Sequence, residues 1–499
     1  MYLGFSRHFS LKCDGKMKRS KTVLNNMMWR FLERTGARLV TALVEIILAR
    51  ILDPEHFGVI ALVTVFIRLF QIFVDSGLAN ALIQKKNAEQ VDFSSVFYFN
   101  ILACPILYTI LFFSSPFIAA FYKMPELTPV LRVLGIVLIV SGLKSVQQAY
   151  VSRHLLFKRF FWATLIGTLF AAAVGILMAY RGYGIWALVA QHLVNTIVDT
   201  IVLWITVKWR PTRQFSWERL KGLLSYGWKL LASSLLNTIS NELRQLIVGR
   251  VYSSSDLGIY NRGRQLPHLF VTNINTSIDS VMLPTMSSVQ DDKERVRSIT
   301  RRAIKTSSYL LMPLMMGLAV CAEPIVRLLL TEKWLPAVFY LRVFCFTYAF
   351  YPIHTANLNA IKAVGRSDIF LKLELIKKAY SLAVLLITAF ISMKALAISS
   401  IFTSILSQVI NSWPNKKLLD YHYRDQLKDI MPHVFMSCLM GAVVYCIHFF
   451  HLNDWLTLMI QIPLGVAIYY TGSKVLHIDS LGYVLGVAKS YLKKEKKAE

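Results

Sequence analysis

The stretch FGVIALVTVFIRLFQIFVDSGLANALIQKK, residues 57–86, decides what kind of protein this is. Its apolar run is long enough to cross a bilayer core, which takes about 20 helical residues. The run contains one arginine, Arg68, near its middle and ends on two lysines. An apolar span that ends on positive charge is typical of a membrane helix whose lysines stay on the cytoplasmic side.

Apolar segments of this length recur along the whole chain. Hydrophobic residues make up 55% of the sequence and the mean hydropathy is +0.49, which excludes a soluble globular protein. The fold class predicted is therefore an all-α polytopic membrane protein with about 14 transmembrane helices. They are placed at 27–49, 57–83, 93–114, 128–151, 160–179, 184–207, 223–247, 257–285, 307–326, 337–361, 369–391, 395–415, 430–449 and 455–472.

Positive charge collects in alternate connections between these segments. The chain has 55 Lys+Arg against 28 Asp+Glu, a formal net charge of +27. We count 34 basic residues in the connections predicted to be cytoplasmic and 7 in those predicted to be outside. The positive-inside rule then places both termini in the cytoplasm. The same rule accounts for the charge without a nucleic-acid partner.

The sequence also repeats itself at an offset of 200 residues. It reads LARILDPEHFGVI around Arg50 and VGRVYSSSDLGIY around Arg250. A second pair, 115–135 and 323–345, places Leu-Arg-Val just inside a helix in each copy. Because each copy holds six helices, both insert in the same orientation. Parallel repeats of this kind build transporters with a central cavity between two lobes.

The repeat predicts the organisation of the chain. Two six-helix lobes surround a central cavity, two more helices follow, and basic tails lie at both ends. The predicted parts are a cytoplasmic tail (1–26), an N-lobe of helices 1–6 (27–207), a cytoplasmic linker (208–222), a C-lobe of helices 7–12 (223–415), helices 13–14 (416–472) and a second cytoplasmic tail (473–499).

Four repeat-related helices carry polar stripes. Residues three and four apart share one face of a helix, and a charge within a membrane costs several kcal/mol. The stripes therefore predict a polar lumen. They comprise Arg30, Arg34, Arg38, Thr41 and Glu45; Thr64, Arg68, Gln71 and Asp75; Ser233, Asn237, Ser240, Asn241 and Arg244; and Asn261, Gln265, His268, Thr272, Asn275 and Asp279, with Arg264 at the edge.

The charges of this lumen suggest its cargo. Arginine binds phosphate bidentately and stays charged when desolvated, so an Arg-rich lumen favours an anion. Acidic residues in the same lumen, namely Glu45, Asp75, Glu242 and Asp279, are candidates for binding a coupling H+ or Na+. Purely structural roles also stay open for these residues. The Arg34 side chain can snorkel to the membrane surface, Asp75 and Asp279 can cap helix ends, and His268 can form an interhelical hydrogen bond. The sequence has no GxxxxGK[ST] loop for ATP and no metal-binding motif, and we expect no cofactor and no enzymatic activity.

Several runs carry a family resemblance. ARILDPEHFGVIALVTVFIRLFQIFVDSGLANALIQKKN (49–87), SSVFYFN (94–100), SVQQAYVSRHLLFKRF (145–160) and DLGIYNRGRQL (256–266) closely resemble the Wzx-type polysaccharide flippases, in particular their colanic-acid and teichuronic-acid exporter branch. The resemblance implies the multidrug/oligosaccharidyl-lipid/polysaccharide exporter superfamily and alternating access. It implies a cargo of undecaprenyl-diphosphate-linked oligosaccharide, moved across the bacterial inner membrane for surface polysaccharide biosynthesis.

The resemblance also implies that cavity arginines engage the diphosphate. Arg34, Arg38, Arg68 and Arg262 match such positions; where this branch often reads YSRAYRL the chain reads YNRGRQL, which moves the second arginine to Arg264. The full set of substrate-binding candidates is Arg34, Arg38, Arg68, Arg244, Arg262, Arg264, His268, Asn237 and Asn241. We expect membrane lipids, a polysaccharide polymerase and assembly proteins as partners, and a monomer. The alternatives are a cation-coupled multidrug antiporter and a non-transporting partner of a glycan assembly complex.

The charge pattern makes a topological prediction. A fused reporter enzyme that is active only outside the cytoplasm should be active after Glu55, Lys123 and Lys333. The same reporter should be silent after Lys86, Arg213 and Glu499. Activity at Glu499 would contradict an even number of membrane helices.

Overall fold

The computed structural model of the protein describes residues 36, 39–75 and 77–486, and the regular structure in these residues is helical. A first helix covers 39–51 in the described part. The further helices are α2 (Pro54–Asp75), α3 (Leu78–Gln84), α4 (Gln90–Tyr122), α5 (Leu127–Leu134), α6 (Ile136–Arg153), α7 (Phe157–Tyr180), α8 (Ile185–Thr206), α9 (Trp217–Val251), α10 (Ser254–Ser287), α11 (Lys293–Val320), α12 (Ala322–Leu330), η1 (Glu332–Trp334), α13 (Ala337–Ala349), α14 (Tyr351–Ala363), α15 (Ser367–Ala389), α16 (Met393–Leu419), α17 (Tyr423–Tyr445), η2 (Cys446–Phe450) and α18 (Asp454–Val475).

The predicted membrane spans correspond to helices, with some differences at breaks and ends. Nine helical stretches within the described residues are long and apolar enough to cross a membrane. The span predicted at 128–151 is interrupted at Gly135, between α5 and α6, and the span at 337–361 at Phe350, between α13 and α14. α9 begins at Trp217, inside the predicted linker, because the Ser216 side chain accepts a hydrogen bond from Arg219 N. Serine is a favoured cap at this position. The count of 14 membrane helices stays a prediction.

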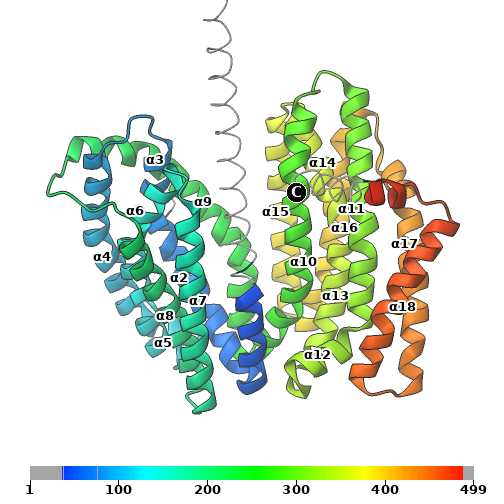
Figure 1. Ribbon diagram of the computed structural model, residues 1–499, viewed down its shortest axis with the longest axis horizontal. Coiled ribbons are helices and arrows are strands. Elements are labelled where there is room, and N and C mark those ends of the chain that lie inside the picture. The colour runs from blue at the N-terminus through cyan, green and yellow to red at the C-terminus, as the bar shows by residue number, and fades with distance from the viewer. Residues whose placement is uncertain (1–35, 37–38, 76, 487–499) are drawn as a thin grey trace, which may run out of the picture. The chain divides into compact units, whose positions relative to one another are not determined.

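The chain divides into two compact units, Met1–Leu257 and Gly258–Glu499. Figure 1 shows α4, α6, α7 and α8 among the helices of the first unit, and α10, α11, α13 and α16 among those of the second. In the first unit α8 packs against both α6 and α7; in the second, α16 packs against α14 and α15. These helices are related by the internal repeat, so the two copies share the same neighbours. α9 packs against α2, α3 and α4 of the first unit.

The segment after α8 is bound to the first unit by buried groups. Trp209 is buried and packs against Phe93 and Phe97 of α4. Its carbonyl accepts a hydrogen bond from Gln147 Nε2 at 3.2 Å. Further along, Ser95 Oγ accepts from the backbone N–H of Ser216 at 2.9 Å. The predicted linker therefore lies fixed against α4 and sets where α9 begins.

In the second unit a carboxylate joins α11 to α17. Asp429 accepts two hydrogen bonds of 2.7 Å from the guanidinium of Arg301 and one of 2.8 Å from the Tyr421 hydroxyl. The Asp429 side chain is only 5% exposed, whereas that of Arg301 is 53% exposed. Bidentate Arg–carboxylate pairs are among the stronger polar contacts. This contact fixes the first turns of α17 against α11.

We therefore expect Asp429→Asn to destabilise the protein by about 1.5 kcal/mol, the lower end for hydrogen bonds to charged groups because Arg301 is half exposed. The thermal midpoint of the detergent-solubilised protein should fall by a few degrees, as measured by size-exclusion chromatography after heating. Asp420→Asn is the matched control, because Asp420 is 80% exposed and meets Arg297 at 3.3 Å. Exposed pairs contribute little, so equal midpoints for both variants would contradict the prediction.

Candidate functional site

A cleft of about 270 Å³ lies between α2 and α9 in the first unit. Its lining comes from one face of each helix. On α2 and α9 the lining positions follow spacings of three and four residues, which places each set on one side of its helix. They are Arg68, Gln71, Ile72 and Asp75 on α2, and Thr238, Asn241 and Glu242 on α9. The cleft thus contains the candidates Arg68, Asp75, Asn241 and Glu242, predicted from separate helices.

An ion pair crosses this cleft. Arg68 Nη1 donates to Glu242 Oε1 at 2.8 Å. The Arg68 side chain is 60% exposed and that of Glu242 only 15%. Arginine has five N–H donors in a planar fork, so a guanidinium held from one side still presents donors to the cleft. Arg68 is therefore held in place by its counter-ion and accessible to an anion.

The carboxyl of Asp75 is held differently. Gln71, one turn earlier on α2, donates from Nε2 to Asp75 Oδ2 at 3.0 Å. A neutral amide thus contacts this carboxylate, whereas Glu242 contacts a guanidinium. The two acidic groups that line one cleft therefore have distinct chemical surroundings.

The remaining candidates of the first unit lie elsewhere. Arg34 and Arg38 lie outside the described residues. Glu45 is half-buried on the helix over 39–51; on α9, Asn237 is exposed and Arg244 half-buried. These three are not among the described residues that line the cleft.

The candidates of the second unit are split among several partners. Arg264 Nε donates to the Tyr348 hydroxyl at 3.1 Å, and the His268 ring lies 5.8 Å from the ring of the same tyrosine. The guanidinium of Arg262 lies 5.2 Å from the Trp334 ring. Asp279, in contrast, accepts a hydrogen bond from Asn359 Nδ2 of α14 at 2.5 Å. Only Arg264 and His268 therefore meet at a shared side chain among the described contacts.

The structure reveals a charged contact that the stripes did not predict. Lys144 Nζ on α6 lies 3.0 Å from Asp199 Oδ2 on α8, with side chains 15% and 13% exposed. Each is an isolated charge on its own apolar helix, so neither forms a periodic stripe. The available signal was chemical: a lysine and an aspartate within predicted membrane spans each require a partner.

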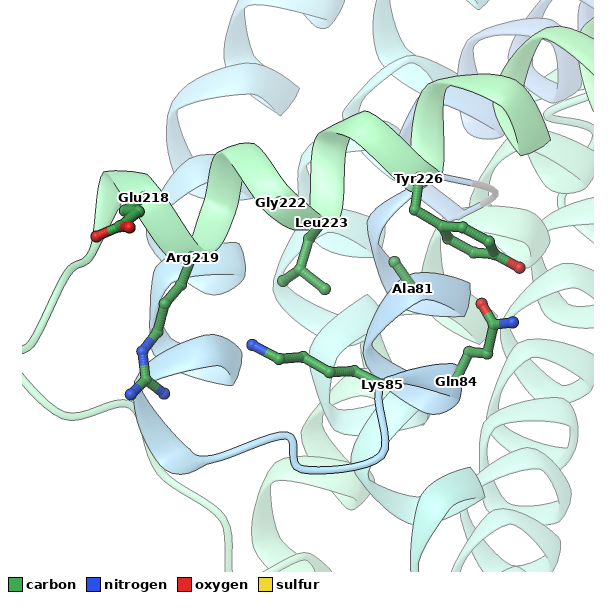
Figure 2. A pocket seen from close by; sticks show the side chains of 8 residues that line it. All are labelled: Ala81, Gln84, Lys85, Glu218, Arg219, Gly222, Leu223 and Tyr226. Atoms are coloured by element: carbon green, nitrogen blue, oxygen red, sulfur yellow. The ribbon is translucent and has the colours of Figure 1, made fainter.

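A larger pocket, of about 600 Å³, lies between α3 and the first turns of α9. Figure 2 shows the Lys85 ammonium and the Arg219 guanidinium extending toward the same end of this pocket. Both cations already meet carboxylates: Lys85 Nζ lies 2.8 Å from Asp92, and Arg219 Nη1 lies 2.6 Å from Glu89. The hydrogen bond to Glu89 raises the pKa of the Arg219 guanidinium. We interpret these pairs as ties between α3, α4 and α9 rather than as an anion site.

Residues 47–339 match a family described as polysaccharide biosynthesis protein. The chain belongs to this family. It is 26% identical over 315 residues to the succinoglycan biosynthesis transport protein ExoT of Rhizobium meliloti, covering 63% of this chain and 64% of that relative. It is 23% identical to the teichuronic acid biosynthesis protein TuaB of Bacillus subtilis (80% of this chain, 84% of the relative). It is 24% identical to the lipopolysaccharide biosynthesis protein WzxC of Escherichia coli (80% and 82%).

Solved structures agree on the fold. The lipid II flippase MurJ in an inward closed conformation superposes with a TM-score of 0.72 at 16% identity, covering 91% of this chain and 99% of MurJ. An inward-facing multidrug resistance MATE family transporter of the MOP superfamily superposes with a TM-score of 0.60 at 14% identity. The match covers 76% of this chain and 94% of that transporter. At such identities the likeness establishes the fold alone.

These comparisons confirm several predictions from the sequence. The family resemblance, the all-α polytopic transporter fold and a multi-pass location in the inner membrane are confirmed. The relatives' names describe transport and polysaccharide biosynthesis and the fold is that of transporters, which agrees with the expectation of a transport protein. The roles of the candidate residues stay predictions.

The ion pair in the cleft gives a direct prediction. Glu242→Gln removes the anion that competes for Arg68, so binding of inorganic pyrophosphate by the purified protein should tighten by roughly three- to tenfold, or about 1 kcal/mol. Microscale thermophoresis at low ionic strength measures this change. Glu126→Gln, at an exposed position before α5, is the control. Unchanged affinity in Glu242→Gln would show that Arg68 does not bind the anion.

Proposed function

We propose that this protein is a flippase that moves oligosaccharide linked to a polyprenyl diphosphate from the inner to the outer leaflet of the bacterial inner membrane, for the synthesis of a surface polysaccharide. Family membership, the names of the relatives and the MurJ-like fold support this proposal. The observation that carries it is Arg68, an exposed guanidinium in the middle of an apolar helix, facing a cleft.

The chemistry of Arg68 fits a diphosphate. A planar guanidinium matches phosphate oxygens bidentately and remains charged in a site with little water. When no cargo is bound, Glu242 supplies the counter-charge that an intramembrane arginine needs. A diphosphate that replaces Glu242 keeps Arg68 neutralised, so the guanidinium stays paired both with and without cargo.

Other parts of the proposal concern coupling and partners. The chain has no nucleotide-binding loop, so an H+ or Na+ gradient is the energy source we propose, with Glu45, Asp75, Glu242 and Asp279 as candidate coupling groups. We expect a monomer that works beside a polysaccharide polymerase and assembly proteins. Multidrug antiport is the second function that this fold supports, but an exposed guanidinium in the cleft repels a cationic drug.

Substitution of the arginines tests the proposal. Arg68→Ala and Arg38→Ala should each abolish surface polysaccharide in a complemented deletion strain, while the protein still accumulates in the membrane. Lys at either position should restore export only in part, because the charge is kept and the bidentate fork is lost. In reconstituted vesicles, flipping of a nitrobenzoxadiazole-labelled polyprenyl-diphosphate oligosaccharide, measured by dithionite quenching, should fall at least tenfold in Arg68→Ala.

Arg213→Ala provides the control, since Arg213 is exposed in the segment after α8 and should be silent in both assays. Full export by a variant that carries both Arg38→Ala and Arg68→Ala would overturn the proposed diphosphate site. Normal flipping by that variant in vesicles would overturn it independently of the cell.

A further inference from the structure

The Lys144–Asp199 pair joins α6 and α8 in the interior of the first unit, where both side chains are about six-sevenths buried. The internal repeat relates this helix pair to α14 and α16 of the second unit. There the corresponding contact is neutral: Asn411 Nδ2 lies 3.0 Å from His354 Nδ1. A hydrogen bond between neutral groups therefore suffices to join these two helices. The charges in the first unit need a further explanation.

Asp75 provides it. Lys144 pairs directly with Asp199 and acts on Asp75 only at longer range, and α2, which carries Asp75, packs against both α6 and α8. These three side chains carry two negative charges and one positive charge, which leaves one negative charge in excess. Asp199 holds the ammonium at 3.0 Å, while Asp75 has the neutral Gln71 amide. The excess charge therefore resides on Asp75, which lines the cleft.

The charged and titratable groups around Asp75 come from each helix packed near it. They are Arg68 on α2, Lys144 on α6, Asp199 on α8, Cys104 on α4 and Glu242 on α9, while His192 of α8 interacts with Glu45 and Arg68. Arg68 is neutralised by Glu242, and Lys144 by Asp199. Within the described residues, Asp75 is thus the carboxylate of this group that accepts a hydrogen bond from a neutral amide instead of pairing with a cation.

Gln71 points to a proton rather than a metal ion as the balancing charge. In the described part of the chain, Gln71 Oε1 is buried without a hydrogen-bond partner, while Nε2 of the same amide donates to Asp75. A protonated Asp75 has an O–H donor that matches this vacant acceptor after rotation of the amide. The amide can therefore pair with the ionised and with the neutral carboxyl. A metal ion would instead need several oxygen ligands around it.

We propose that Asp75 carries the coupling proton of transport, and that Lys144 acts as a tethered counter-ion that neutralises Asp199 and so leaves Asp75 as the exchanging group. This inference rests on the proposed flippase function for its transport role. A proton from the water on the side of higher proton concentration adds to the Asp75 carboxylate, giving a neutral carboxyl. The same proton leaves to the opposite side and regenerates the carboxylate. One proton crosses per cycle at this group.

Infrared difference spectra between acidic and alkaline pH test proton binding on the purified wild-type chain without cargo. The wild type should show the band of a protonated carboxyl that Asp75→Asn lacks and Asp75→Glu retains. Asp420→Asn is the control, because Asp420 is an exposed carboxylate that pairs with Arg297, and this variant should keep the band that Asp75→Asn lacks. A spectrum of Asp75→Asn identical to that of the wild type would overturn the proposal.

Flipping in vesicles tests the role of Lys144. We measure the ratio of flipping rates of the labelled polyprenyl-diphosphate oligosaccharide with and without a pH gradient. Asp75→Asn should lower this ratio to one. Asp199→Asn should do the same, because Lys144 is then released to pair with Asp75 and keep it ionised. Adding Lys144→Met to Asp199→Asn should restore the wild-type ratio. The two positions together then carry no net charge, as they do in the wild type.

A merely structural pair would not give rescue by the double variant. If the double variant responds to the pH gradient as little as Asp199→Asn does, the role of Lys144 is overturned. Failure of the proposed function would appear differently. If the wild type does not flip the labelled lipid, the infrared band still reports whether Asp75 binds a proton. Binding of inorganic pyrophosphate by Asp75→Asn reports separately whether the Arg68 cleft is intact.

Discussion

Every charge placed inside a membrane needs a counter-charge, and this requirement governs the interior of the first unit. Arg68 is paired with Glu242 across the cleft, and Lys144 with Asp199 between α6 and α8. Each contact joins helices that are distant in sequence, so neutralising a charge also fixes the packing of two helices. The groups that make this interior polar are thus the same groups that join its helices.

Much of the fold follows from two periodicities in the sequence. Apolar runs of bilayer length predicted the helices, and the 200-residue echo around Arg50 and Arg250 predicted two related halves whose helices share the same neighbours. The breaks at Gly135 and Phe350 were not predictable, because the apolar run continues through both positions. The start of α9 was also missed, since the cap at Ser216 lies in a basic stretch that reads as a loop.

The candidate site was predictable to the extent that it is periodic. Spacings of three and four residues placed Arg68, Gln71 and Asp75 on one face, and the structure brings this face to Asn241 and Glu242. Periodicity within one helix cannot show which residue of another helix it meets. The Lys144–Asp199 contact therefore had no signal beyond the presence of two lone charges. The second unit shows the same limit, because Arg262 and Arg264, two positions apart, have different partners.

The geometry of α9 has a mechanical consequence. Arg219, near its first turn, is tied to Glu89 of the segment before α4, and Glu242, six turns later, is tied to Arg68 of α2. One 35-residue helix is thus held to the rest of its unit by an ionic contact near each end. An anion that takes Arg68 from Glu242 removes the second of these and leaves the first. Occupancy of the cleft thus breaks an ionic contact between α2 and α9, while the contact of the same helix with Glu89 stays in place.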